Sequence, residues 1–339
     1  MGINLKEIVI ENEITFKDLK NKTLAVDAYN LLYQFITTIL QFDGTPLTDS
    51  NGNITAHLVG LMSRLKSFYE NNIKLVFVFD GKALELKKEE LQKRKEVKEK
   101  AFQKLQEASI ENDYDAMKKY SKRIRTIDEN IVNETKEFLN IMGIPYIDAF
   151  HDAEPQAAYL VNNGICYGVL SQDFDNLLFG AKRFIKNLSI TGKRKIQGRT
   201  IEIKPKIIEL DENLKKLEIN QEQLIILGLL IGTDFNNKGI PKIGPKTALK
   251  LVKEYKDNYD KLFEEIKWND YFKQDWKEIY NIFNEPRIKK DVKIEFKEVD
   301  ENKLKTFLID KHDFSENNVN KFLENINKKE QQISLESFF

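Results

Sequence analysis

The chain contains the stretch Thr23-Leu24-Ala25-Val26-Asp27, a short apolar run that ends in an acid and passes directly into the helical pattern of Ala28–Leu40. Runs of this length and composition are typical of buried parallel strands. Similar runs recur along the chain, at Leu75–Asp80, Tyr167–Ser171 and Phe184–Leu188. Helical patterns lie between these runs, at Ile54–Glu70, Ile131–Met142 and Ala153–Asn163. The alternation predicts an α/β fold with a mostly parallel central sheet flanked by helices.

A long stretch from about Leu84 to Ile127 interrupts this alternation. It is helical in composition and contains neither glycine nor proline. Residues 85–100 hold seven Lys or Arg and five Glu, whereas residues 118–125 hold five Lys or Arg and no acid. The stretch is therefore interpreted as a basic helical insertion between two α/β halves.

Two interpretations of this insertion are open. In the first it is a solvated helical hairpin, in which Glu90 and Arg94 simply pair at a spacing of four residues. In the second, Lys87 and Arg94 share one helical face, because seven residues make about two turns. That face begins close to Asp80, where the two cations could hold a phosphate group and stabilise its charge during a reaction.

Composition limits the chemistry that the chain can perform. The 54 Lys and Arg balance the 54 Asp and Glu, so a basic surface must be offset by acids elsewhere. Cys166 is the single cysteine, which excludes a disulfide framework and a cysteine-rich zinc site. The histidines, His57, His151 and His312, are far apart in sequence, so a metal ion is most easily held by oxygen ligands.

The sequence carries no sign of export or of a membrane anchor. The N-terminus lacks the pattern of a signal peptide. The longest apolar run, Leu224–Ile231, is too short to span a bilayer. We therefore expect an intracellular protein, cytoplasmic and associated with the nucleoid if DNA is its substrate.

Seven carboxylates stand at the ends of the predicted elements: Asp27, Asp80, Asp152, Glu154, Asp173, Asp175 and Asp234. Each could serve only as a helix cap or a turn residue. However, the carboxyl ends of parallel strands meet at one edge of a sheet, so we expect the seven to share a crevice. Their mutual repulsion would be relieved by two divalent ions, Mg²⁺ or its substitute Mn²⁺. Two such ions about 4 Å apart suit hydrolysis of a phosphodiester by water.

The segment Gly239–Ala248 follows an apolar helix, Asn220–Gly232, and is rich in glycine and proline. Its glycines and the helix that follows would let backbone N–H groups approach phosphates, with Lys242 and Lys246 adding charge. A P-loop is a weaker interpretation, because Pro245 breaks the sequence before Lys246 and Thr247. A purely structural turn also stays open.

The chain ends in an apolar segment with a glutamine at its start. A spacing of three brings Gln332, Leu335 and Phe338 onto one side of a 3₁₀ turn, beside Phe339. Such a segment on a flexible tail would be a short docking peptide for a partner protein.

Together these residues resemble the flap endonuclease family of structure-specific 5′ nucleases, within the Rad2/XPG superfamily, and its archaeal members in particular. The resemblance covers nearly the whole chain. The motifs that carry it are Met1-Gly2-Ile3, Ala25-Val26-Asp27-Ala28, Val78-Phe79-Asp80-Gly81-Lys82, Met142-Gly143-Ile144-Pro145-Tyr146, Asp152-Ala153-Glu154, Asp173-Phe174-Asp175, Gly232-Thr233-Asp234 and the hairpin after Gly239.

The resemblance implies a PIN-like 5′-nuclease fold with one nuclease domain over 1–327. That domain comprises halves at 1–83 and 128–255, a helical arch at 84–127, a helix–two-turn–helix element at 232–255, a helical part at 256–327 and a flexible tail at 328–339. The tail is similar to the family's peptide for the sliding clamp (PCNA), which implies clamp contacts from Gln332, Leu335, Phe338 and Phe339.

The resemblance also implies roles for single residues. The seven acids fall on the family's metal ligands. Catalytic roles are implied for Lys87, Arg94, Asp27, Asp80 and Glu154. DNA contacts are implied for Gly2, Tyr33, Arg64, Lys87, Arg94, Gly232, Asp234, Lys242, Gly244 and Lys246. A K⁺ ion is expected at the helix–two-turn–helix turn.

Three positions depart from the family pattern. Asp152 stands where the family usually has Glu, Leu40 where some relatives are basic, and Pro241 within the usual Gly-Ile-Gly pattern. We expect the metal site to tolerate the shorter acid, because the family's acid there acts largely through water.

The activity that the resemblance implies is cleavage of 5′ flaps, with 5′→3′ exonuclease activity, in Okazaki fragment maturation and base excision repair. The expected protein is a monomer that binds branched DNA and the sliding clamp. Alternatives are a sister 5′ exonuclease, a Holliday-junction resolvase, and a non-catalytic adaptor that binds DNA and clamp.

Overall fold

The computed structural model describes residues 3–110, 113, 116, 120, 126–190, 192–196 and 199–336. Side chains are described for these residues except at 88–91, 109–110, 190, 192–196, 199–201 and 328–336. None of the helices in these ranges combines the length and apolar character needed to cross a membrane.

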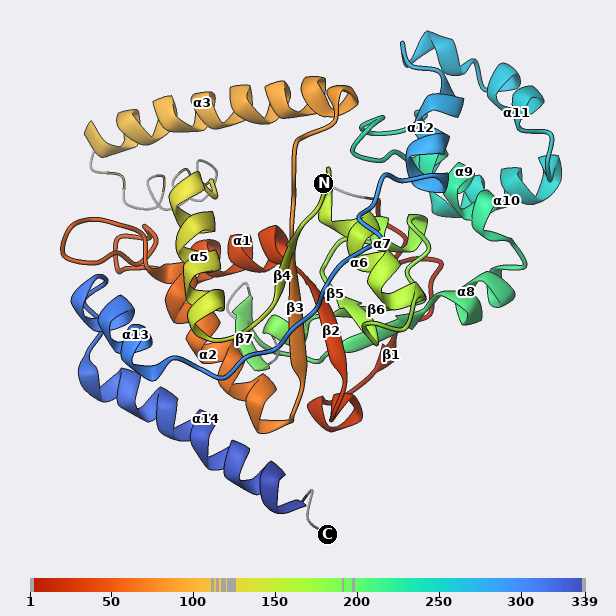
Figure 1. Ribbon diagram of the computed structural model, residues 1–339. Helices are drawn as coiled ribbons and strands as arrows, with labels where there is room; N and C mark the ends of the chain where they lie inside the picture. The colour runs from red at the N-terminus through yellow and green to blue at the C-terminus, as the bar shows by residue number, and fades with distance from the viewer. Residues whose placement is uncertain are drawn as a thin grey trace.

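A seven-stranded mixed sheet forms the centre of the molecule (Figure 1). Its order is β1-β9-β6-β5-β2-β3-β4, with β4, β3, β2, β5 and β6 parallel and β9 antiparallel to both β6 and β1. The strands are β1 Asn12–Glu13, β2 Thr23–Asp27, β3 Lys74–Phe79, β4 Tyr146–Asp148, β5 Gly168–Leu170, β6 Arg183–Lys186 and β9 Lys206–Glu209. A separate hairpin joins β7 Gly192–Ile196 to β8 Arg199–Ile203.

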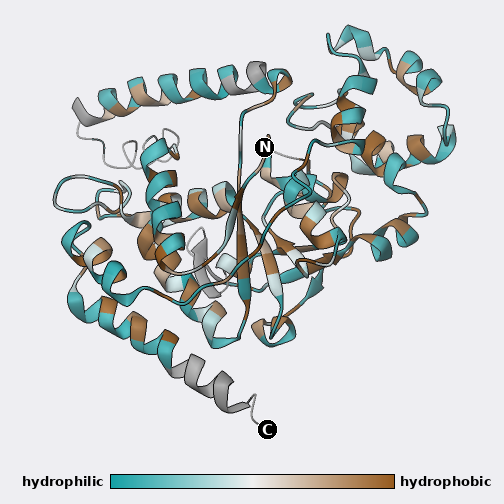
Figure 2. Ribbon diagram, in the orientation of Figure 1, coloured by the Kyte–Doolittle hydropathy of each residue, from teal (hydrophilic) through white to brown (hydrophobic). Residues whose placement is uncertain are grey.

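The central strands are buried on both faces because their side chains alternate between two apolar clusters. Leu24 and Val26 of β2 pack with the helices of one face, whereas Ala25 packs with the helix of the other. A third cluster covers the β6–β9 side of the sheet, where Phe184 is completely buried. Figure 2 shows the hydrophobic residues gathered on the strands and on the packed helices.

The cluster that contains Leu24 and Val26 is formed with helices α1, α2, α5, α13 and α14. The cluster that contains Ala25 is formed with α6. The third cluster is formed with α7 to α12. Their bounds are α1 Ala28–Thr38, α2 Ala56–Glu70, α5 Glu129–Ile141, α6 Ala153–Asn162, α7 Asp175–Leu178, α8 Leu210–Leu217, α9 Gln221–Ile231, α10 Pro245–Tyr255, α11 Tyr259–Glu265, α12 Trp276–Asn284, α13 Glu301–Lys305 and α14 Glu316–Glu336.

Helix α3, Lys88–Ile110, is a long helix that follows one 3₁₀ turn, Glu85–Lys87. It lies across the top of the molecule in Figure 1, above the edge at which the parallel strands end. Its described side chains are mostly exposed, including Val97 and Phe102. The expected basic run at 118–125 lies almost entirely outside the described residues.

An extended segment links α12 to α13 and crosses the outside of the sheet (Figure 1). The N–H of Lys297 donates to the carbonyl of Gly143, and the amide of Gln156 exchanges hydrogen bonds with the backbone of Lys289. The segment therefore fastens the C-terminal helices to α5 and α6.

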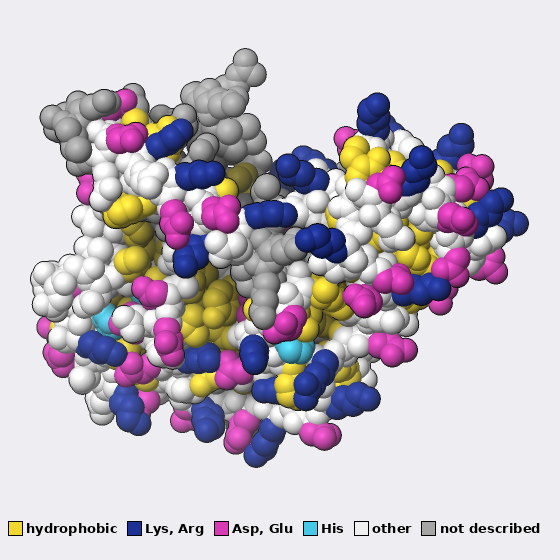
Figure 3. Space-filling view, turned by 90° about the horizontal axis from the view of Figure 1, so that it is seen from above, with side chains coloured by type: hydrophobic (Ala, Val, Ile, Leu, Met, Phe, Trp, Pro, Cys, Tyr) yellow, Lys and Arg dark blue, Asp and Glu magenta, His cyan; other side chains and the backbone are white. Residues whose placement is uncertain are grey.

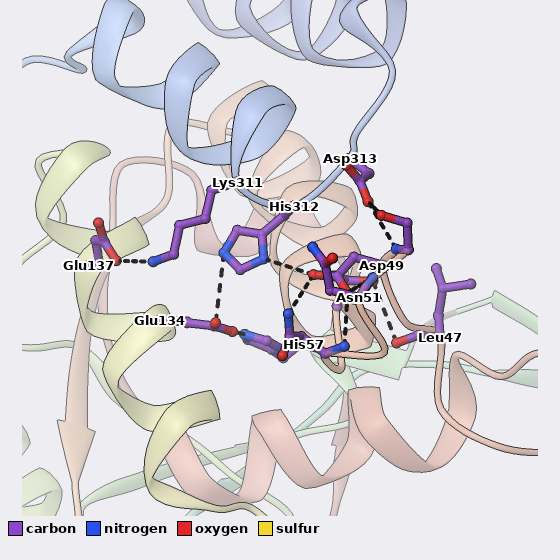
Figure 4. A network of polar contacts seen from close by, with 12 residues as sticks. Leu47, Asp49, Asn51, His57, Glu134, Glu137, Lys311, His312 and Asp313 are labelled. Carbon is purple, nitrogen blue, oxygen red and sulfur yellow. Dashed lines mark hydrogen bonds and ion pairs between the residues drawn. The ribbon is translucent and has the colours of Figure 1, made fainter.

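Two buried histidines reinforce the packing of α14 and the preceding loop against α2 and α5 (Figure 4). The Nε2 atom of His57 lies 3.3 Å from Glu134, and the ring nitrogens of His312 lie 3.8 Å from Glu134 and 3.8 Å from Asp49. These contacts join residues that are far apart in the sequence.

The four strands and five helices predicted by range are all present. Six of these nine are shorter than expected by one or two residues, β2 and β3 have the expected length, and α5 is one residue longer. Strand β9 is not among the strands predicted from the sequence. Its run of four residues is too short to be distinguished from a helix by sequence periodicity.

The C-terminal tail also differs from expectation. The backbone of α14 stays helical to Glu336, whereas a flexible tail was expected from 328. The run of Glu, Asn, Lys and Gln before it contains no Gly or Pro that would end the helix.

Candidate metal centre and nucleic-acid interface

Asp27 and Asp80 come at the ends of the neighbouring parallel strands β2 and β3. Asp27 is the N-cap of α1, and its carboxylate accepts from the N–H of Asn30 at 2.9 Å and from the hydroxyl of Ser171 at 3.0 Å. Asp80 accepts from the N–H of Ala153 at 2.7 Å, at the start of α6. Strand ends and helix starts thus place the two carboxylates at one edge of the sheet.

Gly81 permits a close crossing that places Asp152 beside Asp80. Its N–H donates to the carbonyl of His151 at 2.6 Å. A Cβ atom at this position would lie only 2.2 Å from the carbonyl oxygen of Ala149, so a larger residue cannot be accommodated without moving backbone. The crossing aligns the start of α6, and with it Glu154, against the end of β3.

Asp173 and Asp175 are held in a tight turn after β5. The hydroxyl of Ser171 accepts from the N–H of Asp173 at 3.2 Å, and Asp173 accepts from the N–H of Asp175 at 3.1 Å. Asp175 in turn accepts from the N–H of Ile3 at 2.9 Å. The N-terminal segment of the chain therefore touches the acidic cluster directly.

Burial and mutual repulsion together change the protonation of the carboxylates. Burial, together with the charge of Asp80, raises the pKa of Asp27 to about 7. Asp80 reaches solvent, yet the protein around its carboxyl and the charge of Asp152 raise its pKa to about 6. Burial is also the main reason that the pKa of Glu154 and that of Asp175 lie well above their ordinary values. At neutral pH the cluster therefore retains protons that carboxyl groups in water would release.

Two cationic side chains, one from the 3₁₀ turn before α3 and one from α3 itself, reach into this cluster. The Nζ atom of Lys87 lies 2.8 Å from Asp152, and the guanidinium of Arg94 lies 2.9 Å from Asp234. Burial lowers the pKa of Lys87, but Asp152 and Glu154 raise it more, so the pKa ends above its ordinary value. Lys87 is thus a permanent cation among the acids.

The pKa of each of five acids is raised in part by the charge of another acid of the set, and Asp152 and Asp234 are among the acids that act in this way, so the structure brings all seven together. Within the described residues, no three His, Cys, Asp or Glu side chains already form a group that could hold a metal ion. The donor set nevertheless fits hard divalent ions, since every donor is a carboxylate oxygen. Positive charge placed here would relieve the repulsion that raises these pKa values.

The predicted hairpin lies between α9 and α10. The N–H of Ile240 donates to the carbonyl of Leu230 at 2.8 Å, which folds the turn back onto α9. Gly232 has a φ of 100°, and a Cβ atom there would lie 2.3 Å from the backbone nitrogen of Gly239. Two glycines are thus required where the chain crosses itself.

Lys242 and Lys246 are both exposed on this element, and Gly244 caps α10 with open space on its Cβ side. Figure 3 views this face together with α3 and shows Lys and Arg side chains spread across it, with acidic side chains between them. The mixture agrees with the zero net charge of the chain.

The other predicted contact residues are dispersed. Tyr33 is exposed on α1, and Arg64 is half-buried on α2. Gly2, Phe338 and Phe339 lie outside the described residues. Gln332 and Leu335 lie on the helical backbone of α14, but their side chains are not described.

Three residues at the site received no role from the sequence alone. Ser171 bridges Asp27 and Asp173, Gly81 allows the backbone crossing, and the N–H of Ile3 binds Asp175. Ser171 and Gly81 each adjoin a predicted strand-end acid motif, which is the one signal that could have singled them out.

Comparisons with known proteins match the whole chain. The sequence pattern of the XPG N-terminal domain matches residues 1–101, and that of the XPG I-region matches residues 143–234. A Picrophilus torridus protein named flap endonuclease 1 is 46% identical over 344 residues, covering 100% of both chains. A Hyperthermus butylicus protein of the same name is 44% identical over 333 residues, covering 97% of this chain and 95% of the relative.

Among solved structures, the flap endonuclease-1 of Methanococcus jannaschii is similar over 97% of this chain and 98% of that chain, with a TM-score of 0.76 and 34% identity. Its similarity therefore includes both halves of the sheet. It supports the α/β fold expected from the strand and helix pattern.

Proposed function

Because this chain belongs to the flap endonuclease 1 family of XPG nucleases, and so is a phosphodiester hydrolase of DNA replication and repair, we propose that its seven clustered carboxylates hold two divalent metal ions. Nucleases of this family are metal-dependent. The observation that carries the proposal is the gathering of the acids at one edge of the sheet, where burial and the charges of neighbouring acids raise the pKa of Asp27 to about 7 and that of Asp80 to about 6. Mg²⁺ fits this all-oxygen site, and Mn²⁺ would be a substitute.

The acids divide into two linked groups. In the first group, the charges of neighbouring acids, Asp152 among them, help to raise the pKa of Asp27, Asp80 and Glu154. In the second group, the charge of Asp234 helps to raise the pKa of Asp173 and of Asp175. Ser171 connects the groups through Asp27 and Asp173. Bound divalent ions would supply charge for the reacting phosphate and lower the pKa of water. The short Asp152 would act at greater distance than the Glu usual in the family.

Lys87 and Arg94 would bind the scissile phosphate. Both are already drawn to the acidic cluster, at 2.8 Å from Asp152 and 2.9 Å from Asp234. A phosphate entering the cluster would take hydrogen bonds from these cations, which stabilise the negative charge that grows during hydrolysis. The arch helix α3 would thereby be linked to cleavage.

The remaining DNA would lie on the helix–two-turn–helix element and on α1 and α2. Exposed Lys242 and Lys246 suit contacts to phosphates, and the backbone at Gly244 is open to a ligand at the start of α10. A K⁺ ion in the turn stays a prediction from the family resemblance. Tyr33, exposed on α1, offers an aromatic face on which a base could stack. Arg64 and Gly2 are proposed as further contacts.

The substrate would be branched DNA with a 5′ flap, processed during Okazaki fragment maturation and base excision repair. Specificity for a junction without base reading is consistent with contacts that are mainly to phosphates. Exonuclease action from a 5′ end would use the same site.

The C-terminal residues Gln332, Leu335, Phe338 and Phe339 are proposed to bind the sliding clamp. Deletion of 332–339 should abolish stimulation by the clamp and leave basal cleavage unchanged. Stimulation that survives the deletion would remove this role from the tail.

The activity itself is tested with a labelled double-flap DNA, cleaved with Mg²⁺ or with EDTA, beside a four-way junction and a blunt duplex. We expect metal-dependent cleavage at the base of the flap, well above cleavage of the other two substrates. Preference for the junction or for the blunt end would instead assign the chain the specificity of a sister nuclease.

A further inference from the structure

Lys186 is a buried lysine that the proposed chemistry does not use. It is the last residue of β6, and its side chain is 11% exposed. Its Nζ atom lies 2.8 Å from a carboxylate oxygen of Glu11 and 3.9 Å from the ring centroid of Phe174. Burying a cation costs free energy of folding unless an opposite charge or hydrogen bonds compensate for the lost water, so a buried lysine is expected to have a specific role.

Glu11 compensates two lysines at once. Lys186 and Lys206 face each other directly in the antiparallel ladder of β6 and β9, where like charges are unfavourable. One oxygen of Glu11 lies 2.8 Å from Lys186 and the other lies 2.7 Å from Lys206. Burial raises the pKa of Glu11, but hydrogen bonds from the two lysines outweigh it and lower the pKa, so Glu11 is a carboxylate. The triad keeps one net positive charge beside Phe174.

Phe174 stands between two of the seven acids. Its ring is buried and packs edge-on against Phe184 at a centroid distance of 5.7 Å. It also precedes the first residue of α7, in the turn where Asp173 accepts from the N–H of Asp175. A cation over the ring face is attracted to it, which fixes the ring and the turn that carries it.

The N-terminal segment thus reaches the Asp173–Asp175 turn from two directions. At one end the N–H of Ile3 donates to Asp175, and at the other Glu11 holds Lys186 over Phe174. Residue Ile10 between them is fixed by Asn213, whose side chain oxygen accepts from its N–H at 2.6 Å.

We propose that Lys186, held by Glu11, is a positioning residue for the metal centre: its ammonium group fixes the ring of Phe174 and thereby the carboxylates of Asp173 and Asp175. The inference rests on the proposed role of these acids as metal ligands. It assigns Lys186 no contact with metal or DNA. Outer residues that orient ligands typically change metal affinity by about 10- to 100-fold when they are replaced.

The test is a Mn²⁺ titration of the full chain without DNA, followed by the electron paramagnetic resonance signal of free Mn²⁺. In Lys186→Met, which removes the charge and keeps the length, the dissociation constant for Mn²⁺ should rise by about 10-fold. Lys186→Arg should restore most of the affinity, because a guanidinium also binds Glu11 and an aromatic face. The thermal midpoint is measured in parallel to confirm that each variant is folded.

Lys204→Met is the matched control. Lys204 lies 2.8 Å from Glu13 in an exposed ion pair near the same sheet edge, and it has no contact with Phe174 among the described interactions. Its Mn²⁺ affinity should equal that of the parent chain. Equal affinity in folded Lys186→Met would overturn the proposal.

A second variant covers the case in which Lys186→Met does not fold. Phe174→Leu keeps an apolar side chain but removes the ring, so it should weaken Mn²⁺ binding to a similar degree, and unchanged affinity would contradict the proposal. Asp175→Asn distinguishes a failure of the proposed metal centre from a failure of the positioning role of Lys186. If the parent chain binds Mn²⁺ and Asp175→Asn binds it equally well, the metal centre itself is misassigned and the positioning role is overturned with it.

Discussion

The Nζ atom of Lys87 lies 2.8 Å from Oδ1 of Asp152, and this ion pair joins the 3₁₀ turn before α3 to the N-cap of α6. Phe235 also lies against Lys87, with its ring centroid 4.9 Å from Nζ. The lysine is therefore held in place before any substrate binds. An ammonium group that is already in position can stabilise the charge that develops in the transition state, because the side chain does not have to move during the reaction.

Replacing Lys87 with methionine should therefore reduce turnover more than DNA binding. We expect kcat on a flap substrate to fall by about 100-fold or more, because one positioned donor to a developing charge is lost. Steady-state cleavage at several DNA concentrations measures kcat and KM, and binding of the flap DNA in Ca²⁺ measures affinity. Lys100→Met, on the exposed side of α3, is the control and should cleave at nearly the parental rate. A Lys87→Met loss that appears wholly in KM would argue against a role in the chemical step.

The raised pKa values predict how metal ions affect stability at different pH. The pKa of Asp27 is raised from 3.8 to about 7 and that of Asp80 from 3.8 to about 6. The folded chain therefore keeps protons on Asp27 and Asp80 at pH values where the unfolded chain has released them. The stabilisation that these two protonated groups give the folded chain is full below about pH 4 and is lost as the pH rises through 6 to 7.

Mg²⁺ should offset this loss, because it binds the deprotonated acids. The thermal midpoint should rise on addition of Mg²⁺ at pH 8 and change little at pH 5, with roughly 2–4 °C for each kcal/mol of binding. Asp27→Asn should reduce both the pH dependence and the response to Mg²⁺. An equal rise at the two pH values would contradict the link between these protons and the metal.

The two lysines of the helix–two-turn–helix element should contribute affinity without sequence preference. Lys242→Met and Lys246→Met should each weaken binding of flap DNA. Each should also reduce, by about one, the steepness with which the logarithm of the binding constant falls with the logarithm of the salt concentration. Fluorescence anisotropy at several KCl concentrations gives both quantities. Glu254→Gln, on the same helix as Lys246, is the control. A slope that is unchanged in both lysine variants would mean that this element does not contact phosphates.

His312 should make the fold sensitive to mild acid. The pKa of His312 is below its ordinary value of 6.5, mainly because the ring is buried. The charges of Glu134 and Asp49 raise this pKa, whereas those of Lys311 and His57 lower it. The unfolded chain therefore takes up a proton first, so the contribution of His312 is complete above about pH 6.5 and is lost as pH falls below it.

His312→Asn should lower stability at pH 7.5, because buried packing against Phe307 is lost, but it should flatten the decline towards pH 5.5. Urea unfolding at the two pH values measures this difference. A decline as steep as that of the parent chain would show that another group takes up the proton.

The sequence predicted the sheet and the positions of the acids because both depend on local patterns. A strand that ends in Asp can be recognised from five residues, as at Thr23–Asp27, and parallel strands place their ends together. Ser171 and Ile3 could not be recognised in this way. Their hydrogen bonds reach Asp27 and Asp175, which are 144 and 172 residues away.

Short or isolated elements were the other source of error. Strand β4, Tyr146–Asp148, and strand β9, Lys206–Glu209, have too few residues to show a period. The triad of Glu11, Lys186 and Lys206 is equally hidden, because its members meet only when the ladder of β6 and β9 forms.

The central claim is that the seven acids hold two divalent ions, and anomalous diffraction from crystals of the chain grown with Mn²⁺ and flap DNA tests it most directly. The account predicts two Mn²⁺ peaks about 4 Å apart, one among Asp27, Asp80, Asp152 and Glu154 and the other among Asp173, Asp175 and Asp234. No peak within this cluster, at Mn²⁺ concentrations that support cleavage, would contradict it.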